Sequence, residues 1–80
     1  MKLHPLRLRR LEKNWSQYHL AFLTGVPQTR ISYAERGYPT LAVKEKAKIA
    51  ECLNLPVEEL FPLDWQVPDR SIEYRKKLNE

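Results

Sequence analysis

Four polar residues near the middle of the chain, Gln28, Thr29, Ser32 and Tyr33, carry hydrogen-bonding groups at helical spacing. On an α-helix, at about 100° per residue, they share the side opposite Ala34. Gln pairs bidentately with adenine, Thr contacts a thymine methyl group or donates a hydrogen bond, and Tyr offers a ring and a hydroxyl. These side chains are therefore suited to reading base edges in the major groove of DNA.

The residues around them form two short predicted helices joined by a tight turn, residues 16–37. Ser16 can cap the first helix, and Gly25 permits a left-handed turn. Val26 is an apolar residue that can sit beneath the elbow, and the second helix is expected over 27–36. This arrangement is typical of a helix-turn-helix unit.

Three further helices are expected from periodicity and from the placement of proline and capping residues: 5–13, 42–53 and 57–61. The fold class is then all-α, a compact five-helix domain over residues 1–61. Residues 62–80 are expected to be a linker and a C-terminal extension, with a candidate last helix over 69–78.

The predicted core comes from the inward faces of these helices. In the first helix the spacing favours a buried stripe of Leu8, Leu11 and Trp15, with Leu6 outside it, and Trp15 is expected to pack onto Leu20. The remaining predicted inward residues are Leu20, Ala21, Leu23, Val26, Ile31, Ala34, Val43, Ala47, Ile49, Ala50, Leu53, Val57, Leu60 and Phe61.

The net charge of +4 is unevenly distributed. Residues 1–39 carry seven Lys and Arg against two Glu, a net +5, whereas residues 40–80 carry seven bases against eight acids, a net −1. The basic half also holds the helix-turn-helix residues, as expected for a phosphate-binding face. An Arg-rich solvated helical surface is the alternative.

The composition argues against several other classes of protein. No apolar run approaches the roughly 20 residues of a membrane span, and no signal-peptide pattern is present. One cysteine and two histidines give no metal-ligand spacing, and no nucleophile–base pair or phosphate loop is found. We expect a cytoplasmic, nucleoid-associated protein that is not an enzyme and has no metal or cofactor.

Residues 6–61 resemble the Cro and phage-repressor (XRE-like) helix-turn-helix family. The residues that carry the resemblance are Ser16-Gln17, Leu20-Ala21, Gly25-Val26, Ile31-Ser32, Glu35-Arg36-Gly37, Ile49-Ala50, Leu53, Leu55 and Glu58-Glu59-Leu60-Phe61. The resemblance implies a lambda-repressor-like fold whose third helix reads DNA.

The resemblance also implies roles for individual residues. It makes Gln28, Thr29, Ser32 and Tyr33 the base-reading candidates, and it makes Ser16, Gln17, Arg36 and Tyr38 the phosphate-contacting candidates. Arg10 and Glu35 match a structural ion pair of the family, and Gln17 is in a position to brace Gln28. Tyr33 and Tyr38 could instead cover apolar surface.

Four residues depart from the family pattern, among them Arg9, which stands where an apolar residue is common. Pro27 stands where a capping Ser or Thr is usual, so the third helix must begin without that hydrogen bond. His19 replaces a common Glu, which removes a capping box. Phe22 lies at a commonly polar position, where it indicates either a partner surface or partial burial under the first helix.

The sequence is most consistent with a DNA-binding transcriptional regulator, with repression as the favoured mode. Its expected partner is double-stranded DNA, which it would bind as a homodimer on two half-sites. One alternative is an antitoxin that represses its own operon and holds a protein partner through Phe22 or residues 62–80. Another is a protein-interaction module on the same fold.

Overall fold

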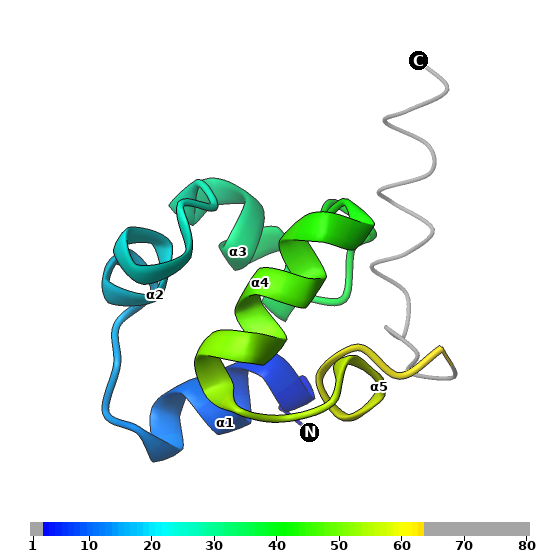
Figure 1. The fold of residues 1–80 in the computed structure, drawn as a ribbon, viewed down its shortest axis with the longest axis horizontal. Coiled ribbons are helices and arrows are strands. Elements are labelled where there is room, and N and C mark those ends of the chain that lie inside the picture. The colour runs from blue at the N-terminus through cyan, green and yellow to red at the C-terminus, as the bar shows by residue number, and fades with distance from the viewer. Residues whose placement is uncertain (1–2, 64–80) are drawn as a thin grey trace.

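The computed structural model describes residues 3–63, which form five helices and no strand (Figure 1). The helices are α1 (Pro5–Glu12), α2 (Gln17–Thr24), α3 (Gln28–Glu35), α4 (Val43–Leu53) and α5 (Val57–Leu60). The predicted all-α fold is confirmed, and every helix begins and ends within one residue of the expected position. The candidate last helix over 69–78 lies outside the described residues, and the division at residue 61 stays a prediction.

Local hydrogen bonds explain the turn between α2 and α3. The Ser16 hydroxyl accepts the amide of His19 at 2.9 Å, so it caps α2 as expected. Gly25 ends α2 with a φ of 76°, a left-handed conformation that favours glycine. The Thr24 hydroxyl then donates to the Leu20 carbonyl and accepts the amide of Val26. The two helices therefore meet at a fixed elbow.

The boundaries of α3 and α4 depend on different devices. Pro27 precedes α3 and makes no side-chain cap, while the Tyr38 amide closes the far end by donating to the Tyr33 carbonyl. Glu45 caps α4 by accepting the amide of Ala42 through Oε1. Asn54, with a φ of 56°, ends α4 in the left-handed conformation, as predicted.

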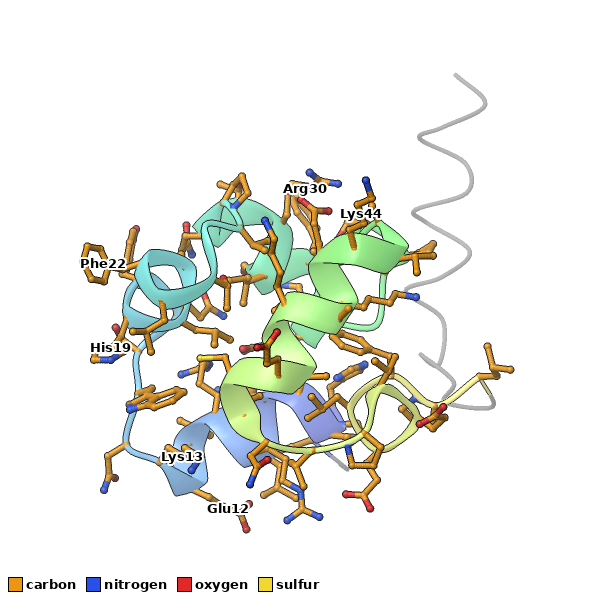
Figure 2. The ribbon with its side chains drawn as sticks, in the orientation of Figure 1. Glu12, Lys13, His19, Phe22, Arg30 and Lys44 are labelled. Atoms are coloured by element: carbon orange, nitrogen blue, oxygen red, sulfur yellow. The ribbon has the colours of Figure 1, made fainter. Side chains whose placement is uncertain are left out.

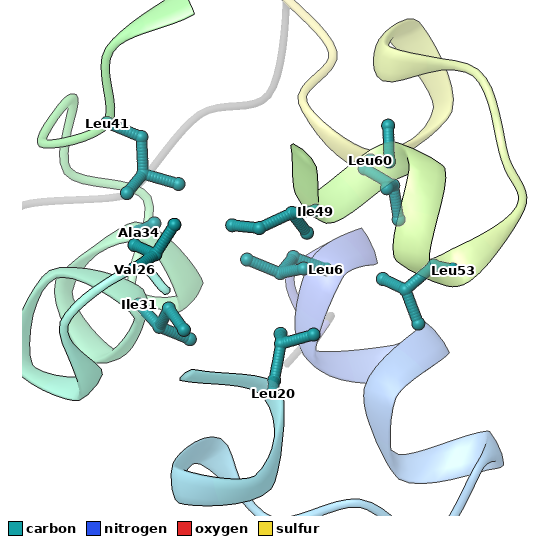
Figure 3. Close-up of a cluster of buried hydrophobic side chains, with 10 residues drawn as sticks. Leu6, Leu20, Val26, Ile31, Ala34, Leu41, Ile49, Leu53 and Leu60 are labelled. Carbon is teal, nitrogen blue, oxygen red and sulfur yellow. The ribbon is translucent and has the colours of Figure 1, made fainter. Parts of the chain in front are cut away.

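The core lies between α1, the α2–α3 pair, α4 and α5, and Figure 3 shows its side chains converging from all five helices and two of the loops. Its buried members are Leu6, Leu20, Val26, Ile31, Ala34, Leu41, Ile49, Ala50, Leu53 and Leu60. Because so small a domain buries limited apolar surface, each of these residues contributes a large share of the stability.

The predicted inner face of α1 is wrong. Leu6 is 0% exposed, whereas Leu8 is 43% exposed and Leu11 is also exposed. The buried residues of α1 are Leu6 and Arg10, which lie four positions apart and so share a face. The apolar pattern misled because a charged residue with a buried partner occupies the second inward position.

Three other predicted core residues are exposed: Leu23, Val43 and Ala47. At 100° per residue, Leu23 lies about 60° from buried Leu20 and Ala47 about 60° from buried Ala50, so each falls just outside the buried stripe of its helix. Val43 shares a side of α4 with Ala50, and it is exposed as the first residue of the helix. The buried stripes of α2 and α4 are thus narrower than predicted.

Trp15 was expected to pack on Leu20, and the structure places it against the core cluster to which Leu20 belongs. It is half-buried against the core, and its ring stacks on His19 with 5.3 Å between centroids. The Lys13 ammonium nitrogen also lies over the Trp15 ring, 5.7 Å from the ring centroid. His19, which lacks the capping carboxylate usual at its position, therefore covers the indole at the start of α2.

His4 is a buried residue that sequence reasoning did not identify. Its Nδ1 accepts the amide of Leu6 at 3.1 Å and so caps α1. Burial lowers the pKa of His4 from 6.5 to about 4, although the negative charge of Glu35 opposes this shift. The neutral imidazole is thus the form that the folded domain accommodates.

Replacing Leu6 should test the corrected face of α1. We expect Leu6→Ala to lower the free energy of unfolding by about 2 to 5 kcal/mol, because it leaves a cavity in the core. The matched change Leu8→Ala removes the same atoms from an exposed position and should cost less than about 1 kcal/mol. Urea unfolding of both variants measures the difference, and equal losses would contradict the packing.

The His4 cap should make stability depend on pH. Between pH 6.5 and 4 the unfolded chain binds a proton at His4 that the folded domain does not, so stability falls as the pH decreases through this range. The expected loss is on the order of 2 kcal/mol. His4→Asn keeps a capping side chain without the titration, so its stability should fall less between pH 6.5 and 4. The free energy of unfolding of both proteins is measured with urea at several pH values. If it falls equally with decreasing pH in both, the assignment to His4 is wrong.

Candidate nucleic-acid interface

The predicted base-reading residues all lie on α3, and each has some exposed surface. Thr29 and Tyr33 are exposed, while Gln28 and Ser32 are half-buried. The opposite side of α3 carries Ile31, Ala34 and Glu35, all of which are buried. The helix therefore fixes its inner side in the domain and presents a polar outer side.

A buried ion pair connects α3 to α1. Arg10 donates to both carboxylate oxygens of Glu35, from Nε at 2.6 Å and from Nη2 at 2.9 Å, and the two side chains are only 7% and 2% exposed. Arg10 Nη1 also donates to the Trp15 carbonyl at 2.6 Å, in the loop before α2. A bidentate pair of this kind sets relative orientation as well as distance.

Gln17 extends this pair to the outer side of α3. Its Nε2 donates to Glu35 Oε1 at 3.0 Å, and its Oε1 accepts from Gln28 Nε2 at 2.7 Å. Within the described residues Gln28 makes no other side-chain hydrogen bond. Its Oε1 and its second Nε2 hydrogen therefore remain available while the side chain is held in place.

Tyr33, Arg36 and Tyr38 form a contact cluster at the C-terminal end of α3. The Tyr33 and Tyr38 rings are 5.8 Å apart at an angle of 44°, and the Arg36 guanidinium lies 5.5 Å from the Tyr33 centroid. Tyr33 stays substantially exposed despite these contacts. The cluster places a base-reading candidate next to two phosphate-contacting candidates.

The N-terminal ends of α2 and α3 carry the remaining candidates. Ser16 is exposed, and because its oxygen accepts a hydrogen bond, its hydroxyl hydrogen is still available to a ligand. Behind Pro27, the amides of Gln28 and Thr29 have no hydrogen-bond acceptor among the described residues. Free amides at a helix N-terminus favour an anion nearby.

Phe22 points away from the domain on the outer side of α2 (Figure 2). It is 86% exposed, so the alternative of burial under the first helix is wrong. Tyr18, one turn earlier on the same helix, is also exposed. Together they form an aromatic face of α2.

Arg30 has a role that sequence reasoning missed. It was counted only as part of the positive charge of residues 1–39, yet its guanidinium bonds to the Thr40 carbonyl and to Glu45. The available signal was Glu45, the third residue of α4, which is the position of a capping carboxylate. Spacing alone could not place that carboxylate beside α3.

Across residues 3–63, no cluster of three or more His, Cys, Asp or Glu side chains is placed to hold a metal ion. No helix within that range has the length and apolar character needed to cross a membrane.

Breaking the buried ion pair should destabilise the domain far more than breaking a surface pair. Glu35→Gln leaves Arg10 buried without its countercharge, so the free energy of unfolding should fall by about 3 to 5 kcal/mol. Glu12→Gln breaks the exposed Arg9–Glu12 pair of 3.1 Å and should cost less than about 1 kcal/mol. Thermal and urea unfolding compare them, and similar losses would show that Arg10 and Glu35 are not effectively buried.

The comparisons with known proteins agree with this geometry. A helix-turn-helix family model matches residues 6–60, which covers all of α2–α5 and nearly all of α1. Neither the curated proteins nor the solved structures contain a significant match to the chain. The family match covers well over half of the sequence and includes the residues from Arg10 to Glu35 that form the ion pair and the Gln17–Gln28 bond. The chain therefore belongs to the Cro/C1-type, XRE-like helix-turn-helix family of DNA-binding transcription regulators.

Proposed function

We propose that the protein is a sequence-specific repressor that places α3 in the major groove of an operator. The observation that carries this proposal is the continuous set of bonds from Arg10 through Glu35 and Gln17 to Gln28. It holds a base-reading side chain in one orientation before DNA is bound. Preorganisation of this kind lowers the entropy cost of binding.

Gln28 has the chemistry to recognise adenine. Its Oε1 can accept a hydrogen bond from the adenine N6 amino group while its second Nε2 hydrogen donates to N7. The first Nε2 hydrogen stays with Gln17, so the pairing does not require the brace to break. The amide plane is then aligned before contact.

Thr29, Ser32 and Tyr33 extend the reading surface along α3. Thr29 is exposed and can contact a thymine methyl group, and Ser32 can donate to or accept from either member of a base pair. Tyr33 is held by Arg36 and Tyr38, which limits the bases that its hydroxyl can reach.

Phosphate contacts are assigned to Ser16, Gln17, Arg36 and Tyr38. Ser16 and Gln17 lie at the start of α2, and Arg36 and Tyr38 lie just beyond α3, so the two pairs flank the reading surface. Contacts to phosphate fix register without specifying sequence. They make affinity strongly dependent on salt.

A homodimer is the proposed binding form. One recognition helix contacts only a few base pairs, and a two-fold dimer would address two half-sites roughly 34 Å apart. Sedimentation of the protein with and without a two-half-site duplex would measure this assembly.

An antitoxin that represses its own operon is a second candidate, favoured by the exposed aromatic face of Tyr18 and Phe22. Apolar faces of this kind are common sites of protein association. A toxin-like protein encoded beside this one and co-purifying with it would support the antitoxin. The same pull-down with Phe22→Ser would show whether the aromatic face is the contact.

The base and phosphate assignments predict different losses. The bound site is first selected from random duplex DNA, and affinities for it and for random DNA are then measured across salt. Gln28→Ala should lower the discrimination between them by about 1 to 3 kcal/mol. Arg36→Ala should weaken both and reduce the salt slope by about 0.9.

Lys48→Ala, which removes an exposed cation from α4, is the charge-matched control for Arg36→Ala. It should leave the affinities for both DNAs and the salt slope nearly unchanged. If Gln28→Ala weakens the selected site and random DNA equally, Gln28 does not read a base.

A further inference from the structure

Arg30 is a cation on α3 that bonds back to its own domain. Nε and Nη2 donate to the Thr40 carbonyl at 3.3 and 2.9 Å, and Nη1 donates to Glu45 Oε2 at 2.7 Å. Figure 2 shows Arg30 on the same edge of the molecule as Lys44, at the N-terminal end of α4. One guanidinium therefore joins α3, the α3–α4 loop and α4.

Two further hydrogen bonds close this arrangement. The Thr40 hydroxyl donates to the Arg30 carbonyl at 3.0 Å, and Glu45 uses its other oxygen to accept the Ala42 amide at 2.9 Å. We call Arg30, Thr40 and Glu45 the loop latch. Glu45 is half-buried within it, with its side chain 19% exposed, whereas the side chain of Arg30 is 43% exposed.

The latch secures one end of the loop over residues 37–41. At the other end, Gly37 takes a φ of 93° and its amide donates to the Ala34 carbonyl, while the Tyr38 amide donates to the Tyr33 carbonyl. Tyr38 thus belongs to the anchor at the α3 end of the loop, and only Pro39 lies between it and the latch. Tyr38 is also a phosphate-contacting candidate.

We infer that Arg30 is a positioning residue for DNA binding, which holds the α3–α4 loop in its phosphate-contacting conformation and does not itself contact phosphate. This inference rests on the proposed function. Its physical basis is that a charge-assisted network with several bonds restricts a loop more than a single contact does. The positive charge of Arg30 is then largely neutralised by Glu45.

If the latch positions the loop, removing the negative charge of Glu45 should weaken DNA binding, which is the opposite of what net charge alone predicts. Removing a negative charge ordinarily strengthens binding to DNA, because it increases the positive potential of the protein. Glu45→Gln can keep the Ala42 cap but loses the charge that holds Arg30. If the latch positions the loop, this variant binds DNA more weakly even though its net charge rises.

The experiment measures the anisotropy of a fluorescein-labelled, 24-base-pair random-sequence duplex with the full chain across a salt series. We expect Glu45→Gln and Arg30→Met each to weaken binding about three- to tenfold, with the salt slope of Arg30→Met unchanged. The double variant should be no weaker than the weaker single variant, because both changes break one network. Glu51→Gln and Lys48→Met are the charge-matched controls on the exposed surface of α4.

Tighter binding by Glu45→Gln overturns the inference. So does a fall of about 0.9 in the salt slope of Arg30→Met, because that is the change for a lost phosphate contact. Thr40→Ala removes only the hydroxyl bond to Arg30, and it serves as the milder variant if either charge change prevents folding. Thr40→Ala should also weaken binding to the duplex.

Amide hydrogen exchange tests the latch without DNA. The hydrogen-bonded loop amides of Gly37, Tyr38 and Thr40 should exchange faster in Glu45→Gln than in the unmodified protein, while the amides of Ile31 and Ile49 keep their protection. Unchanged exchange in the loop overturns the latch. If the unmodified protein does not bind the duplex, both the proposed function and the phosphate-contacting role of the loop are wrong. The exchange measurement still decides, independently of DNA, whether the latch orders the loop.

Discussion

The buried pair of Arg10 and Glu35 is the interaction on which the rest of the structure depends. Moving two charges out of water is costly, and the cost is offset only when their hydrogen-bonding groups are satisfied. Here Arg10 on α1 donates two bonds to Glu35 on α3 and a third to the Trp15 carbonyl in the loop before α2. Glu35 accepts its own third bond from Gln17 on α2. No buried side-chain nitrogen or oxygen in residues 3–63 lacks a partner. The pair therefore holds α1, α2 and α3 in fixed positions relative to one another.

This ion pair links the core to the proposed reading surface. Apolar packing by Ile31 and Ala34 fixes how deeply α3 lies in the domain, but packing alone tolerates small rotations of a helix. The bonds from Glu35 through Gln17 to Gln28 add a directional constraint, because hydrogen bonds weaken steeply away from linear geometry. Together the two constraints hold the outer side of α3 in the orientation that base reading requires.

Much of the local structure could be predicted from the sequence, because caps and turns depend on nearby residues. Ser16, Gly25 and Asn54 act as expected at the ends of α2 and α4. The face of α1 was mispredicted, because apolar spacing does not show that Arg10, whose pairing with Glu35 the family resemblance implies, takes an inward position beside Leu6. Arg30 was missed because its role comes from tertiary contacts. His4 was missed although its bond to the Leu6 amide is local, because histidine is not among the usual N-cap residues. Two links of the connection from Arg10 to Gln28, the Arg10–Glu35 pair and the Gln17–Gln28 brace, follow from the family resemblance and are present, whereas the bond from Gln17 to Glu35 that joins them was not predicted.

The most direct test of this account is a double-mutant cycle for Gln17→Ala and Gln28→Ala, read as discrimination between the selected site and random DNA. A phosphate contact by Gln17 affects both DNAs alike, so it does not enter this ratio. If Gln17 acts through Gln28, the double variant should lose no more discrimination than Gln28→Ala alone. Additive losses from the two changes would contradict the claim that the network positions Gln28 for base reading.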